Sequence, residues 1–89
     1  MNSNIIIVDV REPAEYLMDH VEGAINLPPA DLMNGAPQLK NIDKNTQLIL
    51  YCRSGSRSNA SMQYLRHIGF TNLVNGINAD HVRKKYLNN

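Results

Sequence analysis

The sequence predicts an α/β fold with a small, mostly parallel β-sheet flanked by helices on both faces. Apolar runs alternate along the chain with stretches of helical spacing, which is the pattern of a parallel sheet covered by helices. The first run, Ile5-Ile6-Ile7-Val8, is apolar without alternation, as in a strand that is buried on both faces. The chain has 89 residues without an internal repeat or a linker, so we expect a single domain over residues 1–89.

The first half of the chain predicts short elements separated by tight connections. Pro13 is compatible with a helix because it falls in the first turn, where its missing N–H is not needed. Leu39 and Ile42 are expected to anchor the segment before the next strand to the core. The expected elements are a strand over residues 5–8, a helix over 12–18, a strand over 24–27, one helical turn over 30–33 and a loop over 34–37.

The second half begins with the best strand in the chain, residues 46–51. Ser58 is then expected to cap a helix, which Gly69 ends in a left-handed conformation while Phe70 folds back onto the last turn. The apolar residues of this helix are Met62, Tyr64, Leu65 and Ile68. The remaining expected elements are a strand over residues 72–74, a turn at Asn75-Gly76 and a helix over 79–87 that uses Val82, Tyr86 and Leu87.

Composition excludes several classes of function. The formal net charge of +1 provides no general attraction for nucleic acid, so no nucleic-acid partner is expected. One cysteine excludes an internal disulfide, a CxxC redox pair and a multi-cysteine zinc site, and His67 and His81 lack metal-ligand spacing. No apolar stretch is long enough to span a membrane, and no secretory signal precedes residue 5, so we expect a cytoplasmic protein as the sequence stands.

The single cysteine, Cys52, lies between the strand over residues 46–51 and the following helix. A lone cysteine is often an inert core residue, but the segment after Cys52 is small, polar and basic: Arg53-Ser54-Gly55-Ser56-Arg57-Ser58. Backbone N–H groups in such a loop, together with the helix N-terminus and the two arginines, favour a thiolate over a thiol. The loop therefore predicts a reactive nucleophile, with Gly55 permitting the tight curvature.

Two motifs resemble the rhodanese family of sulfurtransferases, and the layout is similar to that of the small phage-shock rhodaneses. The loop from Cys52 to Ser58 resembles the active-site loop of the family. The N-terminal signature is similar in Asp9-Val10-Arg11-Glu12-Pro13, Glu15-Tyr16, His20 and Gly23-Ala24-Ile25-Asn26-Leu27-Pro28. Both motifs occur in the family's order and separation.

The resemblance implies a ping-pong transfer of sulfane sulfur through a persulfide on Cys52, with no metal and no cofactor besides that covalent intermediate. The donor would be a small anion such as thiosulfate, which Arg53 would meet, and the acceptor would be cyanide, a thiol or a protein cysteine. Ser54, Gly55, Ser56, Arg57 and Ser58 would complete the anion-binding loop. Asp9, Arg11 and Glu15 would support it, with Arg57 pairing inward with an acidic residue, and His20 is expected to be packed or hydrogen-bonded rather than catalytic.

Two alternatives remain open from the sequence. The first is a cysteine phosphatase or an arsenate reductase, because dual-specificity phosphatases have a similar architecture. Cysteine phosphatases have five residues between the nucleophile and the loop arginine, whereas only four separate Cys52 from Arg57 here. The chain also has no aspartate clearly placed as a general acid. The second alternative is a rhodanese-fold module that only binds partners, against which the presence of Cys52 argues.

The chain departs from the family pattern at two places. Rhodaneses usually begin with an extra strand and helix before the Asp9 motif, and commonly carry Gly-Gly and an aromatic residue after the last strand, where Asn75-Gly76-Ile77 stands here. A shortened N-terminus leaves a sheet edge less covered, so we expect a monomer or a weak dimer. The small phage-shock rhodaneses are exported, so a periplasmic location is expected instead if a leader has been removed.

Overall fold

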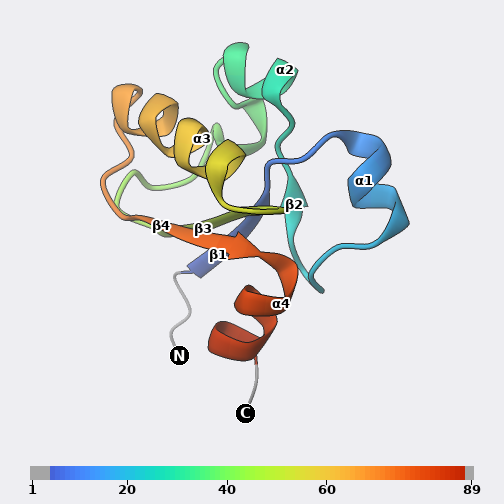
Figure 1. Cartoon of the computed structure of the whole chain (residues 1–89). Helices are drawn as coiled ribbons and strands as arrows, with labels where there is room; N and C mark the ends of the chain where they lie inside the picture. Colours follow the sequence, from blue (N-terminus) through green and yellow to red (C-terminus); the bar gives the residue numbers. More distant parts are fainter. Residues whose placement is uncertain (1–4, 88–89) are drawn as a thin grey trace.

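The computed structural model describes residues 5–87, which form one four-stranded parallel sheet with helices on both faces (Figure 1). The α/β fold predicted from the sequence is confirmed. The elements in chain order are β1 (Ile5–Asp9), α1 (Pro13–Met18), β2 (Ile25–Asn26), α2 (Pro29–Met33), the 3-10 turn η1 (Pro37–Leu39), β3 (Gln47–Cys52), α3 (Ser56–His67), β4 (Leu73–Asn78), α4 (Ala79–Val82) and the π-helical turn η2 (Arg83–Leu87).

The strand order β2-β1-β3-β4 brings the two sequence motifs together. All neighbouring strands pair in parallel, and Asp9 at the end of β1 lies opposite Tyr51, one residue before Cys52 at the end of β3. Ligands of open parallel sheets bind outside the carboxyl ends of the strands. Both motifs therefore meet at the edge of the sheet where a binding site is expected.

Two apolar clusters lie on opposite faces of the sheet. Alternate residues of β3 divide between them: Leu48 and Leu50 pack with Leu65 and Phe70 beneath α3, while Ile49 packs with other residues on the opposite face. α2 and α3 cover the first face and α4 covers the second (Figure 1). The second cluster consists of Val21, Ala24, Ile49, Tyr51 and Val82, with Tyr16 and Tyr86 packed against it.

The helix after Cys52 begins earlier than the sequence indicated. Its first residue is Ser56 and its N-cap is Gly55 in the left-handed region (φ 95°), so the prediction that Ser58 caps the helix was wrong. Ser58 lies inside the first turn, where its side chain faces the protein interior. The other end agrees with expectation, because Gly69 has φ 110° and the buried Phe70 donates its N–H to the Leu65 carbonyl.

The last strand is longer than predicted and contains a bulge. Asn75 and Gly76 do not form the expected turn but lie within β4, where the pairing shifts from Leu50↔Asn75 to Tyr51↔Ile77. A Cβ on Gly76 would lie 2.6 Å from Val82 Cγ2 and 3.0 Å from Ile49 Cγ2. Only glycine fits at this close approach between the strand, β3 and α4.

The C-terminal segment is helical as expected, but not as one α-helix. α4 ends at Val82, which is fully buried, and the chain continues as the π-helical turn η2. Leu87 is 42% exposed and does not serve as the core residue that the sequence suggested. None of the helices between residues 5 and 87 has the length and apolar character needed to cross a membrane.

Candidate active site

Cys52 lies at the floor of the loop that joins β3 to α3. The residue is only 2% exposed, and its sulfur accepts hydrogen bonds from the backbone N–H groups of Gly55 at 3.1 Å and Ser58 at 3.4 Å. The Ser58 hydroxyl lies 3.6 Å from the sulfur. The sulfur is thus held at the N-terminus of a 12-residue helix, where the free N–H groups and the helix dipole favour negative charge.

These donors change the acidity of the thiol. Burial opposes ionisation and by itself raises the pKa of Cys52, but hydrogen bonds from the Ser58 hydroxyl and from the N–H groups of Ser58, Ser54 and Gly55 outweigh it. The net effect lowers the pKa to about 7 from an ordinary value of 9.0. A large fraction of Cys52 is therefore thiolate at neutral pH, as a nucleophile requires.

The loop curves tightly at Gly55 and is fastened to β4 by Asn75. The left-handed conformation of Gly55 directs its N–H toward the sulfur and its carbonyl toward the helix. The Asn75 amide donates to the Gly55 carbonyl at 2.9 Å, and its Oδ1 lies 2.6 Å from Ser58 Oγ. A side chain from a different element therefore contacts both ends of the sulfur-binding turn.

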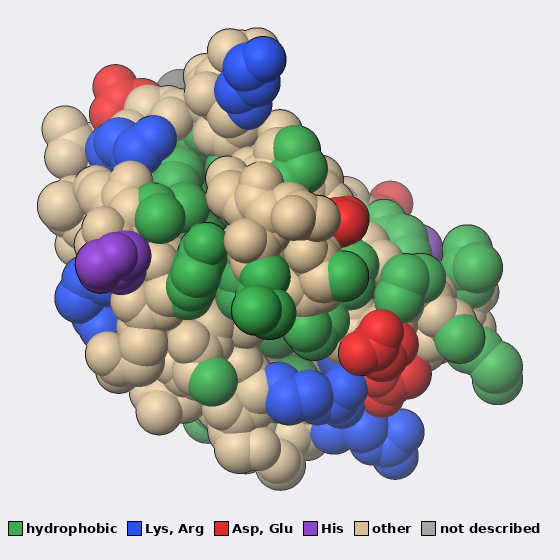
Figure 2. All heavy atoms as spheres, turned by 90° about the horizontal axis from the view of Figure 1, so that it is seen from above, with side chains coloured by type: hydrophobic (Ala, Val, Ile, Leu, Met, Phe, Trp, Pro, Cys, Tyr) green, Lys and Arg blue, Asp and Glu red, His purple; other side chains and the backbone are tan. Residues whose placement is uncertain are grey.

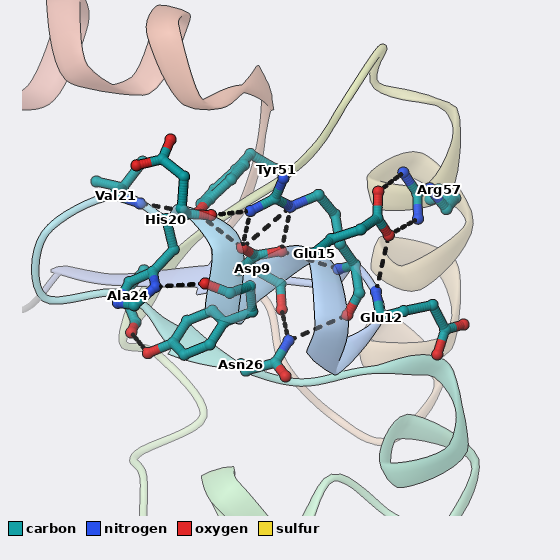
Figure 3. Close-up of polar contacts among 12 residues, drawn as sticks. Asp9, Glu12, Glu15, His20, Val21, Ala24, Asn26, Tyr51 and Arg57 are labelled. Carbon is teal, nitrogen blue, oxygen red and sulfur yellow. Dashed lines mark hydrogen bonds and ion pairs between the residues drawn. The ribbon is translucent and has the colours of Figure 1, made fainter.

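Arg57, in the first turn of α3, pairs with α1. Its Nη1 and Nη2 donate to the two carboxylate oxygens of Glu15 at 2.7 and 3.1 Å (Figure 3). Hydrogen bonds from Arg57 lower the pKa of Glu15 to about 2, so this pair stays charged over the physiological range. Of the acidic residues that the sequence offered as partners for Arg57, the structure selects Glu15.

Asp9 forms a second network with Arg11 and Tyr51, and Figure 3 labels Asp9 and Tyr51 in it. Asp9 is fully buried, and its carboxylate accepts from Arg11 Nη2 at 2.8 Å and from the Tyr51 hydroxyl at 2.8 Å. Burial raises the pKa of Tyr51 to about 12, so its hydroxyl stays protonated and donates to Asp9. The Tyr51 hydroxyl oxygen also accepts a hydrogen bond from the Val21 N–H. This network therefore joins the ends of β1 and β3 to the segment after α1.

Arg53 faces a hollow of about 380 Å³ between the loop and α1. The other charged residues that line it are Arg11, Glu15 and Asp19, and each is engaged in an ion pair. Within residues 5–87, Arg53 makes no ion pair, and its side chain is exposed. Its guanidinium is thus available to an anion from solvent, one residue from the nucleophile.

A mainly apolar groove of about 360 Å³, lined in part by Arg57, lies between α2 and α3. Figure 2 views this face and shows hydrophobic side chains gathered near its middle, with basic and acidic side chains next to them. Met33 is 75% exposed at this groove. The remaining lining residues are Val10, Pro29, Leu32, Ala60, Ser61 and Tyr64.

His20 is packed and hydrogen-bonded, as predicted from the sequence. Its ring stacks on Tyr16 with centroids 3.6 Å apart, and Nδ1 lies 2.7 Å from the Tyr16 carbonyl oxygen, to which it donates. In the part of the chain that the structure describes, no three His, Cys, Asp or Glu side chains lie close enough together to hold a metal ion.

Sequence reasoning located the nucleophile loop and gave Asp9 and Glu15 as candidate partners of Arg57, of which the structure has Glu15, but it missed two contributors. Tyr51 was considered only as an apolar strand residue, although its hydroxyl joins Asp9 to Val21. Asn75 was assigned to a turn, and the only available signal was that it opens the Asn75-Gly76-Ile77 departure from the rhodanese pattern. Neither contact is visible without the register of β3 and β4.

Comparison with known protein families gives a match to the model described as Rhodanese-like domain over residues 1–79. A solved structure described as a rhodanese with anions from E. coli superimposes with a TM-score of 0.75 at 30% sequence identity. It covers 86% of this chain and 89% of that one.

Curated relatives carry different names. The chain is 34% identical over 68 residues to the thiosulfate sulfurtransferase PspE of Escherichia coli. The matched region covers 76% of this chain and 64% of PspE. The chain is also 30% identical over 88 residues to a tRNA uridine(34) hydroxylase of Photorhabdus laumondii, covering 93% of this chain and 25% of the relative. The chain thus spans less than two thirds of the length of either relative.

Proposed function

Because the chain belongs to the rhodanese-like family, we propose that it is a sulfurtransferase that moves sulfane sulfur from thiosulfate or a similar small anion to a thiophilic acceptor through a persulfide on Cys52. The observation that carries the proposal is the position of the Cys52 sulfur at the N-terminus of α3, where it accepts hydrogen bonds from the backbone N–H groups of Gly55 and Ser58. Such a cradle suits a reaction in which sulfur is anionic both before and after each transfer.

The first half-reaction forms the persulfide. The Cys52 thiolate attacks the outer, sulfane sulfur of thiosulfate and forms a new S–S bond, while the original S–S bond breaks and sulfite leaves with its electron pair. A pKa of about 7 provides the thiolate without a separate general base. Arg53, exposed beside the loop, would hold the sulfonate oxygens of the donor.

The second half-reaction returns the enzyme to its starting state. An acceptor such as cyanide or a thiolate attacks the outer sulfur of the persulfide, and the bond to Cys52 breaks with the electron pair remaining on the Cys52 sulfur. The backbone N–H groups that stabilise the thiolate would stabilise it again as the leaving group. No metal or separate cofactor enters either step of this proposal.

The position of Arg57 favours sulfur transfer over phosphate-ester hydrolysis. A cysteine phosphatase needs its loop arginine to hold the phosphoryl oxygens, whereas both terminal nitrogens of Arg57 are committed to Glu15. Only four residues separate Cys52 from Arg57, and this tighter loop suits one sulfur atom better than a tetrahedral phosphate.

The proposal is tested by the intact mass of the purified protein before and after thiosulfate, with cyanide added last. We expect a gain of one sulfur atom, its removal by cyanide and release of thiocyanate, with none of these events in Cys52→Ser. If Cys52→Ser transfers sulfur at the wild-type rate, the mechanism is wrong. If the wild-type protein gains no sulfur from thiosulfate or from a mercaptopyruvate donor, the chain is a binding module of the same fold.

A further inference from the structure

The orientation of the Asn75 side chain is fixed by its partners. Its Oδ1 accepts the backbone N–H of Ile77 at 3.0 Å, and an N–H group can only donate. Its Nδ2 lies 2.9 Å from the Gly55 carbonyl oxygen, which can only accept. Oδ1 is therefore the Asn75 atom that lies 2.6 Å from the Ser58 hydroxyl oxygen.

The Ser58 hydroxyl has one proton and several acceptors around it. Because Asn75 Oδ1 carries no hydrogen, the 2.6 Å contact requires Ser58 to be the donor. The same hydroxyl lies 3.6 Å from the Cys52 sulfur and 3.1 Å from the Gly55 carbonyl. Ser58 is fully buried, so water does not supply another donor in place of this proton.

We propose that Asn75 is a positioning residue that competes with the Cys52 sulfur for the single hydroxyl proton of Ser58. When that proton is directed to Asn75, the sulfur is stabilised mainly by the backbone N–H groups of the loop. When it turns to the sulfur, the thiolate gains the hydroxyl hydrogen bond that contributes to the lowered pKa of Cys52. Asn75 thereby sets the pH at which Cys52 ionises, acting through Ser58 and without contacting the sulfur itself.

The charged groups around the sulfur do not substitute for this competition. Arg57 on α3 interacts with the charge of Cys52, but Glu15 on α1 neutralises it. At the end of β1 the charge of Asp9 is balanced by Arg11. β4, with the sequence LVNGIN, contributes no titratable side chain, so its influence on Cys52 is transmitted through hydrogen bonds.

The test is the titration of the Cys52 thiolate, followed by ultraviolet absorbance, in Asn75→Leu and in wild type. Leucine has the same branched heavy-atom skeleton as asparagine but accepts no hydrogen bond. The Ser58 proton is then shared only between the thiolate and the Gly55 carbonyl, and the charged acceptor is favoured. We expect the midpoint of the titration to fall by on the order of one pH unit. At a given pH this shift corresponds to a roughly tenfold rise in the ratio of thiolate to thiol. Asn72→Leu, at an exposed asparagine outside the loop contacts, is the matched control and should leave the midpoint unchanged.

A second substitution separates this mechanism from a merely structural role. Ser58→Ala should raise the midpoint more in the Asn75→Leu background than in wild type, because only there does the hydroxyl donate fully to sulfur. A midpoint that is unchanged or raised in Asn75→Leu, or an equal effect of Ser58→Ala in both backgrounds, overturns the proposal. If Asn75→Leu does not fold, Asn75→Asp decides when it is compared with and without Ser58→Ala. The repulsion of the new carboxylate is the same in both backgrounds, so the rise of the midpoint must be larger where the Ser58 hydroxyl is present.

The inference rests on the proposed function only in taking Cys52 as the nucleophile. The titration involves no sulfur donor, so it can succeed where the mass experiment fails, and the two failures are distinguishable. If both succeed, the pH profile of persulfide formation should move with the midpoint in each variant.

Discussion

Replacing Cys52 by serine should remove a pH-dependent part of the stability of the protein. The folded thiol has a pKa of about 7, whereas its ordinary value is 9.0. A folded pKa below the unfolded one means that the thiolate is stabilised by folding. The contribution is therefore fully present above about pH 9 and is lost as the pH falls through about 7.

The difference of about two pH units corresponds to roughly 2.7 kcal/mol. Serine is nearly isosteric and can accept the same Gly55 and Ser58 N–H groups, but it does not ionise in this range. The free energy of unfolding of wild type, measured in urea relative to Cys52→Ser, should thus rise by about 2–3 kcal/mol between about pH 6 and about pH 9.5. Other titrating groups cancel in the difference between the two proteins.

Ultraviolet titration of the thiolate provides an independent value for the same midpoint. Agreement between the titration and the stability difference would assign both effects to Cys52. A midpoint near the ordinary value of 9.0, together with a stability difference that does not change with pH, would refute the argument that the hydrogen bonds of the loop stabilise the thiolate.

Three further substitutions test other parts of the structure. Arg53→Ala should raise the KM for thiosulfate about fivefold, because an exposed charge pair is worth roughly 1 kcal/mol. The control Arg66→Ala, on the exposed side of α3, should leave KM unchanged. If Arg53→Ala has the same KM as wild type, Arg53 does not bind the donor. Gly76→Ala should lower the free energy of unfolding by about 1–3 kcal/mol. The loss should be smaller in a Val82→Ala background, where the 2.6 Å contact is gone. An equal loss in both backgrounds would contradict the packing argument. Ile77→Asn should be at least as stable as wild type in urea, because Ile77 has φ 73° and is 38% exposed. Asparagine tolerates this left-handed conformation better than a β-branched residue does. If Ile77→Asn is clearly less stable than Ile77→Val, backbone strain at this position is excluded.

The sequence predicted the parts of the fold that local pattern and parallel topology determine. Asp9 and Cys52 each follow an apolar run, and the carboxyl ends of adjacent parallel strands meet, so their proximity could be inferred without coordinates. Helix α3 was also located by its apolar spacing, and its end was marked by Gly69.

What the sequence could not predict depends on contacts between distant segments. Ser58 has the composition of an N-cap, but Gly55 adopts the left-handed conformation, so the helix begins at Ser56 and the Ser58 hydroxyl turns inward to Asn75. The continuation of β4 through Asn75-Gly76 depends on the close approach of Val82 and Ile49 to a residue without a side chain. These packing constraints override the turn preference of an Asn-Gly pair.

The bulge in β4 also affects how molecules meet one another in a concentrated solution. β4 is an outer strand in the strand order β2-β1-β3-β4, and a regular outer strand offers its free backbone groups as a template for strands of other chains. The shift in pairing at Gly76 and the left-handed conformation of Ile77 interrupt the even spacing of those groups. The irregularity that brings Asn75 to the cysteine loop therefore also disfavours edge-to-edge aggregation, and a variant engineered to straighten β4 would lose solubility along with the shape of its site.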